Sequence, residues 1–334
     1  MKDIYSHLSE AYKFSDSKYF PKILEMSLSE EEATVLLSLP GAAEEVAKKV
    51  DMEKSTVQSI LENQSKKGFI VYDIKEGEKI YDLDTSGRLT GSVMKMSGRS
   101  FEKEVLDLWA KMSDEEFSPE FDEEGHGARI IPIERTVEQG KEILPYEKVS
   151  QILKESKTIA VIPCQCRIML RKCDNPIEVC IARDDLAKLV LEREVGRQID
   201  IKEAISILNE CEEFGLVHAV ADSSKGFCWL CNCCTCCCYF LRAQTKLGRK
   251  HAVVKSRYLS VIDSENCDGC ELCIDRCHFD ALQMKDSSAV VDEGKCFGCG
   301  LCASTCPTDA IELVPVRAPD HIPERVFKPG SFYI

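Results

Sequence analysis

The chain has 334 residues, of which 44% are hydrophobic and 30% are charged, so it is long enough for two or three domains with separate cores. Its formal net charge of −14 argues against a general nucleic-acid surface, because phosphate binding needs concentrated Lys and Arg. The first ten residues lack the apolar stretch of a secretion signal, and no apolar run reaches the length of a membrane span. These features predict a cytoplasmic protein without a membrane span.

All 20 cysteines of the chain follow residue 163, and seven of them lie between Cys228 and Cys238. Thiols stay reduced in the cytoplasm, so metal ligation or redox chemistry is a better interpretation than a disulfide framework. Thiols as crowded as those of residues 231–238 either capture metal or oxidise. The composition therefore predicts metal centres in the second half of the chain, and their sensitivity to oxygen suggests an anaerobic organism.

Residues 1–95 are predicted to form a small helical domain that ends in a hairpin. Apolar residues at helical spacing predict three helices, and two strands around a Glu-Gly turn follow them. The helices are expected at residues 31–39, 42–50 and 54–66, and the strands at residues 69–72 and 79–83. This order of elements resembles the winged helix-turn-helix domains of bacterial and archaeal regulators, and the resemblance implies a DNA-recognition helix at residues 54–66.

The charges of that helix disfavour DNA binding. Glu53 and Glu62 lie beside Lys54, Lys66 and Lys67, which is a poor balance for an element that faces phosphates. We therefore favour a protein-docking module, or a homodimer that forms through this domain, over a DNA-binding role.

Residues 96–143 are rich in Asp, Glu and Gly and are interpreted as an acidic, solvated linker with one helical segment at residues 101–112. After it, residues 144–255 alternate helix and strand and predict an α/β cysteine-rich domain. A helix is expected at residues 146–155, and an apolar strand at residues 158–162 precedes Cys164. A further helix should begin after the N-cap Asp200 and end at Gly215. Cys211 lies on its apolar face and is interpreted as a core thiol.

A 29-residue repeat occupies residues 256–316. Its first unit carries Cys267, Cys270, Cys273 and Cys277, and its second carries Cys296, Cys299, Cys302 and Cys306. Each unit is predicted to be a strand, a cysteine loop, a short helix and a strand. The repeat resembles bacterial-type two-cluster ferredoxins, in which the fourth cysteine of each motif ligates the other cluster.

The resemblance implies two [4Fe-4S] clusters with crossed ligands. The first would be held by Cys267, Cys270, Cys273 and Cys306, and the second by Cys296, Cys299, Cys302 and Cys277. His278 stands where this family has a proline after the fourth cysteine. It is interpreted as an exposed histidine, with tuning of the neighbouring cluster as the alternative.

Eleven further cysteines form two groups that do not have the ferredoxin spacing. They are Cys164, Cys166, Cys173 and Cys180, followed by Cys228, Cys231, Cys233, Cys234, Cys236, Cys237 and Cys238. The motifs PCQCR at residues 163–167 and CNCCTCCC at residues 231–238 resemble a group of largely uncharacterised ferredoxin-fused proteins of anaerobic bacteria and archaea. The resemblance spans residues 144–314 and implies electron transfer.

All of these cysteines except Cys228 are candidate ligands of at least one additional iron-sulfur cluster. Two cubanes with three cysteines left over, or one cubane with a set of free thiols, are both compatible with the count. Arg167 is placed to offset the negative charge of a thiolate-bound cluster. His218 is interpreted as a core histidine, with a role as nitrogen ligand as the alternative.

The chain is thus predicted to be an α+β multidomain protein with an extended tail at residues 317–334, which lies against a partner or its own domain. The favoured function is electron transfer to a redox protein partner within an oxidoreductase complex, and the acidic charge suits docking to a basic partner. An oxidoreductase with a substrate-binding cluster and a redox-responsive regulator are the alternatives. No glycine-rich dinucleotide loop supports an enzyme.

Overall fold

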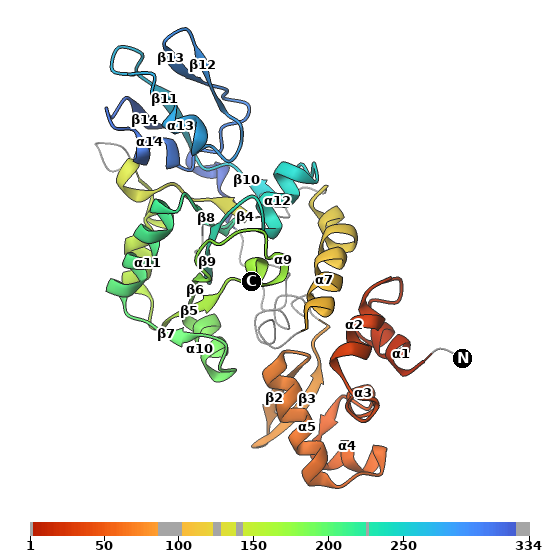
Figure 1. Ribbon diagram of the computed structural model, residues 1–334. Helices are drawn as coiled ribbons and strands as arrows, with labels where there is room; N and C mark the ends of the chain where they lie inside the picture. Colours follow the sequence, from red (N-terminus) through yellow and green to blue (C-terminus); the bar gives the residue numbers. More distant parts are fainter. Residues whose placement is uncertain (1–2, 86–101, 123–127, 138–142, 225–226, 325–334) are drawn as a thin grey trace.

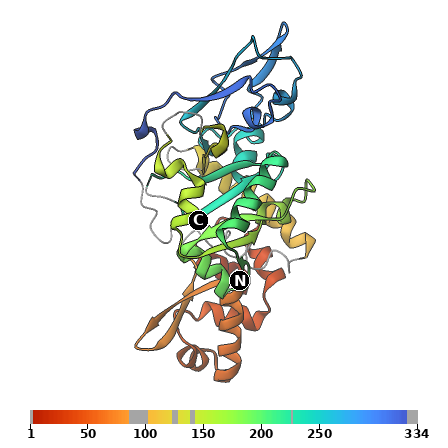
Figure 2. The same ribbon diagram turned by 90° about the vertical axis from the view of Figure 1, so that its left-hand side faces the viewer.

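The computed structural model describes residues 3–85, 102–122, 128–137, 143–224 and 227–324. Three bodies follow one another along the long axis of the molecule (Figure 1). Figure 2 shows the N-terminal body at the bottom, the sheet of the middle body above it and the C-terminal body at the top. None of the helices in these described ranges is both long and apolar enough to cross a membrane.

The N-terminal body contains every helix and strand that its sequence predicts. Its elements are α1 (Ile4–Ala11), α2 (Phe20–Ser27), α3 (Glu30–Leu37), β1 (Gly41–Ala42), α4 (Ala43–Val50), α5 (Lys54–Lys67), β2 (Ile70–Lys75) and β3 (Glu78–Leu83). A capping box formed by Ser29 and Glu32 starts α3, and Gly68 ends α5 with a φ of 86°. The three strands form an antiparallel sheet in the order β1-β3-β2, beside a core of buried apolar side chains from the helices.

The sequence predicts a solvated linker after this body, but residues 102–122 of this acidic segment are folded. The predicted helix is present as α7 (Lys103–Met112) and continues into η1 (Ser113–Phe117) and η2 (Ser118–Asp122). Trp109 is buried in the N-terminal core and meets Phe20 edge to face. Asp114 forms an ion pair with Arg242 of the middle body. The linker interpretation is therefore wrong for residues 102–122, while residues 96–101, 123–127 and 138–142 lie outside the described residues.

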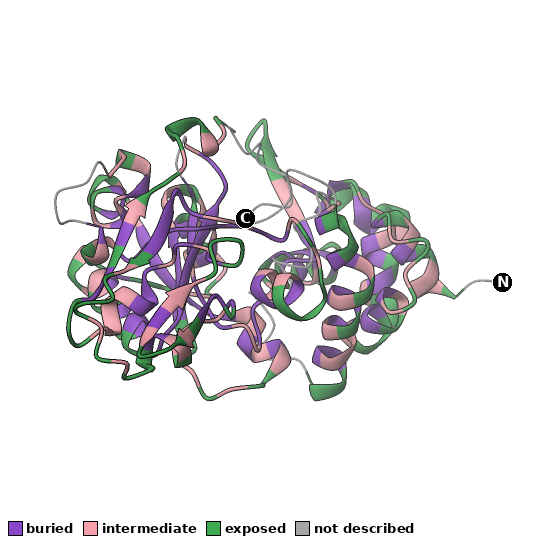
Figure 3. Ribbon diagram, turned by 90° about the horizontal axis from the view of Figure 1, so that it is seen from above, coloured by how far each residue is buried: buried purple, intermediate pink, exposed green. Residues whose placement is uncertain are grey.

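The middle body is a seven-stranded sheet in the order β10-β4-β8-β9-β6-β5-β7, and buried residues follow its strands in Figure 3. The strands are β4 (Ala128–Ile130), β5 (Ile159–Pro163), β6 (Glu178–Arg183), β7 (Arg197–Gln198), β8 (Val217–Ala221), β9 (Trp229–Cys233) and β10 (Val253–Val254). The pairing is antiparallel apart from β10 with β4, so the body is mixed helix and sheet without the parallel sheet of an α/β fold.

Helices cover this sheet, and the sequence predicts two of them, at residues 146–155 and after Asp200. They are α8 (Val149–Glu155), α9 (Gln165–Leu170), α10 (Asp184–Glu192), α11 (Ile201–Glu213) and α12 (Tyr239–Lys246). The helix expected at residues 146–155 is divided into the 3-10 turn η4 (Pro145–Glu147) and α8. Asp200 caps α11 by accepting a hydrogen bond from the backbone N–H of Glu203. Cys211 is fully buried on α11, which confirms its interpretation as a core thiol.

The C-terminal body repeats the predicted unit of strand, cysteine loop, short helix and strand. The first unit is β11 (Tyr258–Ile262), α13 (Leu272–Asp275) and β12 (Leu282–Lys285), and the second is β13 (Ser288–Val291), α14 (Leu301–Thr305) and β14 (Ile311–Pro315). The outer strands β11 and β14 pair with each other, as do the inner strands β12 and β13. The described part of the tail, residues 317–324, lies along its own chain, because Arg317 donates to the Ser256 carbonyl at 2.6 Å.

Candidate metal centres

Two cavities in the C-terminal body bring together the two crossed sets of ferredoxin cysteines. One is lined by Cys267, Cys270, Cys273 and Cys306, and the other by Cys277, Cys296, Cys299 and Cys302. Each contains about 330 Å³ of space between the protein atoms, part of which opens to solvent. The chain crosses between the units because the fourth cysteine of each motif follows its short helix and faces the other cavity. We refer to the two as the Cys270 cavity and the Cys299 cavity.

The loops of these cavities fit a bulky group held by thiolates. Gly269 and Gly298 occupy the same place in the two units and have φ values of 71° and 67°, which favour glycine. A Cβ atom on Gly298 would overlap the carbonyl of Tyr258 and the hydroxyl of Ser256. Burial raises the pKa of Cys302 to about 12, so its thiolate needs a nearby positive charge. Bound iron supplies such charge, and these cavities therefore suit the group that their spacing predicts.

A second set of thiols forms a closed ring in the middle body. Each of these six thiols lies close enough to two others of the set to affect or be affected by their ionisation. In order around the ring they are Cys164, Cys166, Cys238, Cys233, Cys231 and Cys180. We call this set the six-thiol ring. Hydrogen bonding to Cys166 raises the pKa of Cys164 to about 12, whereas hydrogen bonds with Cys166 and Cys233 lower the pKa of Cys238 to about 6.

The register of the sheet builds the ring. Strands β5, β6 and β9 are neighbours, and the pairing of Ile181 with Leu230 places Cys180 opposite Cys231. Cys233 lies two residues farther along β9 and therefore on the same face as Cys231. The remaining thiols follow the ends of β5 and β9: Cys164 and Cys166 at the start of α9, and Cys238 at the N-cap of α12.

Four other thiols form a much tighter group. The Sγ atoms of Cys173, Cys234, Cys236 and Cys237 all lie within 4.8 Å of one another, and two of the pairs are 3.8 Å apart. We call this group the thiol tetrad. The run of residues 231–238 thus divides between two sites, three of its cysteines facing the ring and three the tetrad. Of the other two cysteines of the middle body, Cys228 is exposed and Cys211 is buried on α11.

Arg167 lies between the two groups and is almost fully buried, as its interpretation as a countercharge requires. Its guanidinium donates to the carbonyl of Pro176 at 2.8 Å and to that of Asn232 at 2.8 Å. Burial opposes its charge, but the nearby thiols, first Cys164 and then Cys234, hold the pKa of Arg167 above its ordinary value. A fixed buried cation of this kind stabilises thiolates on either side of it.

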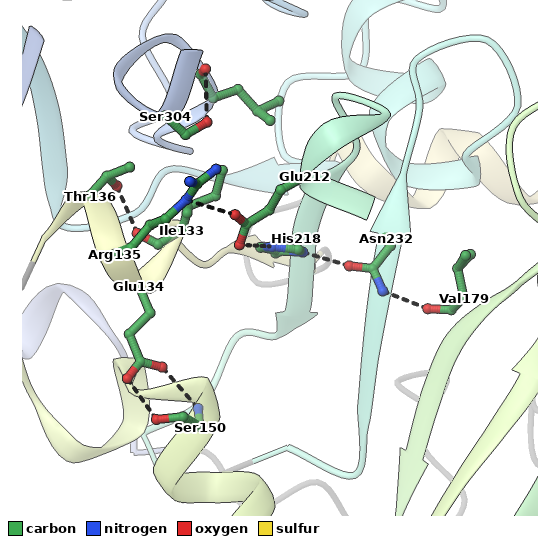
Figure 4. A network of polar contacts seen from close by, with 11 residues as sticks. Ile133, Glu134, Arg135, Thr136, Ser150, Val179, Glu212, His218, Asn232 and Ser304 are labelled. Carbon is green, nitrogen blue, oxygen red and sulfur yellow. Dashed lines mark hydrogen bonds and ion pairs between the residues drawn. The ribbon is translucent and has the colours of Figure 1, made fainter. Parts of the chain in front are cut away.

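Figure 4 shows a polar network that holds the centre of the cysteine run in place. His218 Nδ1 donates to Asn232 Oδ1 at 2.5 Å, because the amide nitrogen of Asn232 is committed to the Val179 carbonyl. His218 Nε2 lies 3.4 Å from Glu212, which also pairs with Arg135 at 3.0 Å. Both ring nitrogens of His218 therefore face protein groups. This agrees with the core interpretation of His218 and leaves no nitrogen for a metal.

His278 connects the Cys299 cavity to the cysteine run. Its Nε2 donates to the Gly215 carbonyl at 2.6 Å, and its Nδ1 lies 3.4 Å from the hydroxyl of Thr235. His278 directly follows Cys277, while Thr235 lies between two cysteines of the tetrad. The expectation of an exposed histidine is wrong, because His278 is half-buried at this contact. The ring of a proline at this position has no hydrogen-bond donor or acceptor for either partner, which accounts for the departure from the ferredoxin pattern.

Sequence reasoning missed three residues of this arrangement: Glu212, Asn232 and Thr235. Asn232 alternates with Cys231 and Cys233 along a strand, and this period of two was a usable signal that it faces away from the thiols. Glu212 follows Cys211 on α11 and gives no local signal, because its partners come from a strand and a distant turn. The role of Thr235 depends on how the middle and C-terminal bodies pack, so the sequence around Thr235 does not predict it.

The comparisons with known proteins agree with the C-terminal geometry. Residues 260–313 match the family model described as 4Fe-4S dicluster domain. No curated protein and no solved structure matches the chain. The matched residues contain all eight cysteines of the two cavities. The chain therefore carries an iron-sulfur domain of the ferredoxin type, joined to a cysteine-rich body.

Proposed function

We propose that the protein is an electron carrier in which the Cys270 cavity faces a redox partner and the Cys299 cavity faces a further iron-sulfur centre in the six-thiol ring. The two cavities would each hold one [4Fe-4S] cluster, with the crossed ligand sets given above. Such clusters gain and lose one electron at a time when bound. The protein residues supply the ligands, exclude water and connect the sites.

The contact of His278 with Thr235 carries this proposal. It joins the residue after Cys277 to Thr235, in the turn between the ring residues Cys233 and Cys238, so the Cys299 cavity and the middle body share one interface. Phe279 and Leu301 belong to the same hydrophobic core as Cys233 and Cys238. A ferredoxin domain that merely hung from a flexible connection would have no need of this shared core.

The surface near the Cys270 cavity supports the docking of a basic partner. Cys270 is exposed, and so is Leu272, two residues farther along the chain. Five exposed carboxylates accompany them in the same unit, namely Asp263, Glu265, Asp268, Glu271 and Asp275. Acidic groups around an apolar spot attract a positively charged partner and leave a desolvated point of contact. The partner would be a redox protein of an oxidoreductase system in the cytoplasm.

The six-thiol ring is the better site for the additional cluster. Four thiolates that bind four different irons must lie farther apart than four that share one ion. Within the described residues, the tight group of thiols is the tetrad, and the ring is more widely spread. Four of the six ring thiols are buried, Cys166 and Cys231 are half-buried, and Arg167 lies against the ring. Both features suit a negatively charged group in a dry site.

Docking explains the N-terminal body better than DNA binding does. Lysines of α5 form ion pairs with acidic residues of the same chain. Lys54 pairs with Glu44 at 3.0 Å, and Lys66 pairs with Glu194 of the middle body at 3.0 Å. Tyr72 of the hairpin bonds to Glu192 beside it. We propose that this body, which resembles a winged helix, is a protein-docking module, and that a DNA-binding role is secondary.

Metal and electron counts on anaerobically purified protein test the electron-carrier proposal. We expect about twelve irons and about three one-electron equivalents per chain, that is, about four irons for each of three centres. The Cys166→Ser variant should lose about four irons and one electron, while the two ferredoxin signals persist in the EPR spectrum. Cys211→Ala, which removes a buried thiol outside both groups, should keep all of them. About eight irons in the wild-type protein, with no change in Cys166→Ser, would contradict a cluster in the ring.

A further inference from the structure

The sulfur positions of the thiol tetrad match a single tetrahedral metal ion. Four sulfurs bound to one ion at about 2.3 Å form a tetrahedron whose edges are about 3.8 Å long. Cys173 Sγ lies 3.8 Å from Cys234 Sγ and 3.8 Å from Cys237 Sγ. All four thiols, with Cys236 as the fourth, lie within 4.8 Å of one another. A disulfide is excluded for these pairs, because its sulfurs are about 2.05 Å apart.

The ferredoxin cysteines of the same molecule serve as an internal standard. They belong to a matched 4Fe-4S domain, and their thiols surround two cavities. Over the described part of the chain, no group of three or more of these eight thiols comes within the 4.8 Å limit that the tetrad meets. The tetrad sulfurs are therefore close enough together to share one ion, whereas the sulfurs of each ferredoxin set surround a cavity.

The tetrad also has the surroundings of a structural site. Cys173 lies in the irregular segment between α9 and β6, and the other three cysteines lie in the turn between β9 and α12. Asn175 Nδ2 donates to Cys173 Sγ at 3.4 Å, as groups around a thiolate ligand do. Arg171 joins the same segment to Asp107 of α7 at 2.5 Å. An ion at the tetrad would tie two segments together beside the contact with the N-terminal body.

We propose that Cys173, Cys234, Cys236 and Cys237 bind one Zn²⁺ ion in a closed tetrathiolate site that contains no inorganic sulfide. Four protein ligands leave no open position, so this ion has a structural role and takes no part in electron transfer. It fixes the turn of residues 234–237, which also carries Thr235 toward His278. The site shares no ligand with the clusters of the proposed carrier, so the two proposals are tested separately.

Metal analysis of a matched pair of variants tests this site. We expect about one zinc per chain in protein isolated under anaerobic conditions. Cys236→Ser, which changes a half-buried ligand, should lower zinc at least about fivefold and leave iron and sulfide unchanged. Cys228→Ser, at an exposed cysteine outside the tetrad, should keep all three. A lower iron content in Cys236→Ser, with or without a lower sulfide content, would overturn the zinc assignment. A zinc content equal to that of the wild type would overturn it as well.

A measurement on the wild-type protein covers the case in which Cys236→Ser does not fold. Zinc K-edge X-ray absorption should show four sulfur neighbours at about 2.3 Å and no iron neighbour. Titration with a mercurial in the presence of a chromogenic zinc indicator should release the same ion once the thiols are modified. Nitrogen or oxygen neighbours in the zinc spectrum, or protein without zinc, would refute the site.

Discussion

The two halves of the ferredoxin repeat have the same cysteine spacing but lie in different surroundings. The Cys270 cavity reaches the surface, where Cys270 and Leu272 are exposed. At the Cys299 cavity Cys296 and Cys302 are buried, and Cys299 packs against the core of the middle body. The backbone N–H of Ile133 also donates to the Cys299 carbonyl at 3.1 Å. A duplicated motif can thus present one site to a partner and the other to its own chain.

Changing one ligand in each half should have the largest and most unequal effect. Cys299→Ser removes a ligand at the packed interface and places a hydroxyl beside apolar groups, so we expect a loss of about 3 kcal/mol or more in the free energy of unfolding. Cys270→Ser should lose about four irons and leave the unfolding of the middle body within about 1 kcal/mol of wild type. Iron content and denaturant unfolding measure both. Equal losses in the free energy of unfolding would contradict the proposal that the Cys299 cavity, unlike the Cys270 cavity, is packed against the middle body.

The equivalent glycines provide a test with matched backbone strain. Gly269 and Gly298 have nearly the same φ, so the strain of an added Cβ cancels in the comparison. Gly298→Ala should cost about 3 kcal/mol, because its Cβ would overlap the backbone of β11. Gly269→Ala should cost about 1 kcal/mol, because its nearest atom, the Ser287 carbonyl at 2.8 Å, lies in a hairpin turn that is able to shift. Thermal unfolding measures the stability that each variant loses. A larger loss for Gly269→Ala than for Gly298→Ala would contradict the tighter packing of the Gly298 loop.

Substitutions in the contact between the C-terminal and middle bodies should lower the free energy of unfolding by a smaller amount. Thr235→Val removes one hydrogen-bond partner of His278 and should cost about 1 kcal/mol, and His278→Ala should cost about 2 kcal/mol because it removes two. The double variant should cost less than the sum of the two, because both changes remove the same contact. Additive effects in a double-mutant cycle would show that the contact does not couple the bodies.

The acidic surface near the Cys270 cavity should affect rates without affecting stability. Asp268→Asn with Glu271→Gln should slow reduction by a cationic dye severalfold at low salt, because it removes two exposed negative charges. The difference should disappear at about 1 M salt, and the free energy of unfolding should stay within about 0.5 kcal/mol of wild type. Stopped-flow reduction with cationic and neutral dyes measures the effect. A rate change that is equal for both dyes would exclude an electrostatic cause.

Local patterns predicted most of the elements and the location of one pair of sites. Apolar spacing and end signals located α5 and α11, and each has the glycine or cap that its sequence indicates. The acidic run failed as a guide, because Phe117 and Phe121 are buried among carboxylates that pair across bodies. Composition describes a segment by itself, whereas burial depends on the surface it meets.

The sequence by itself determined the ferredoxin units, because three of the four cysteines of each cavity lie within seven residues of one loop and the repeat supplies the fourth. It did not determine how the cysteine run divides. That division depends on the register of β6 with β9, on the turn after β9 and on the segment that carries Cys173. The contact of His278 with Thr235 likewise exists only because two bodies pack together. Metal ligands that come from one loop are specified locally, and ligands from several strands are specified by the sheet that aligns them.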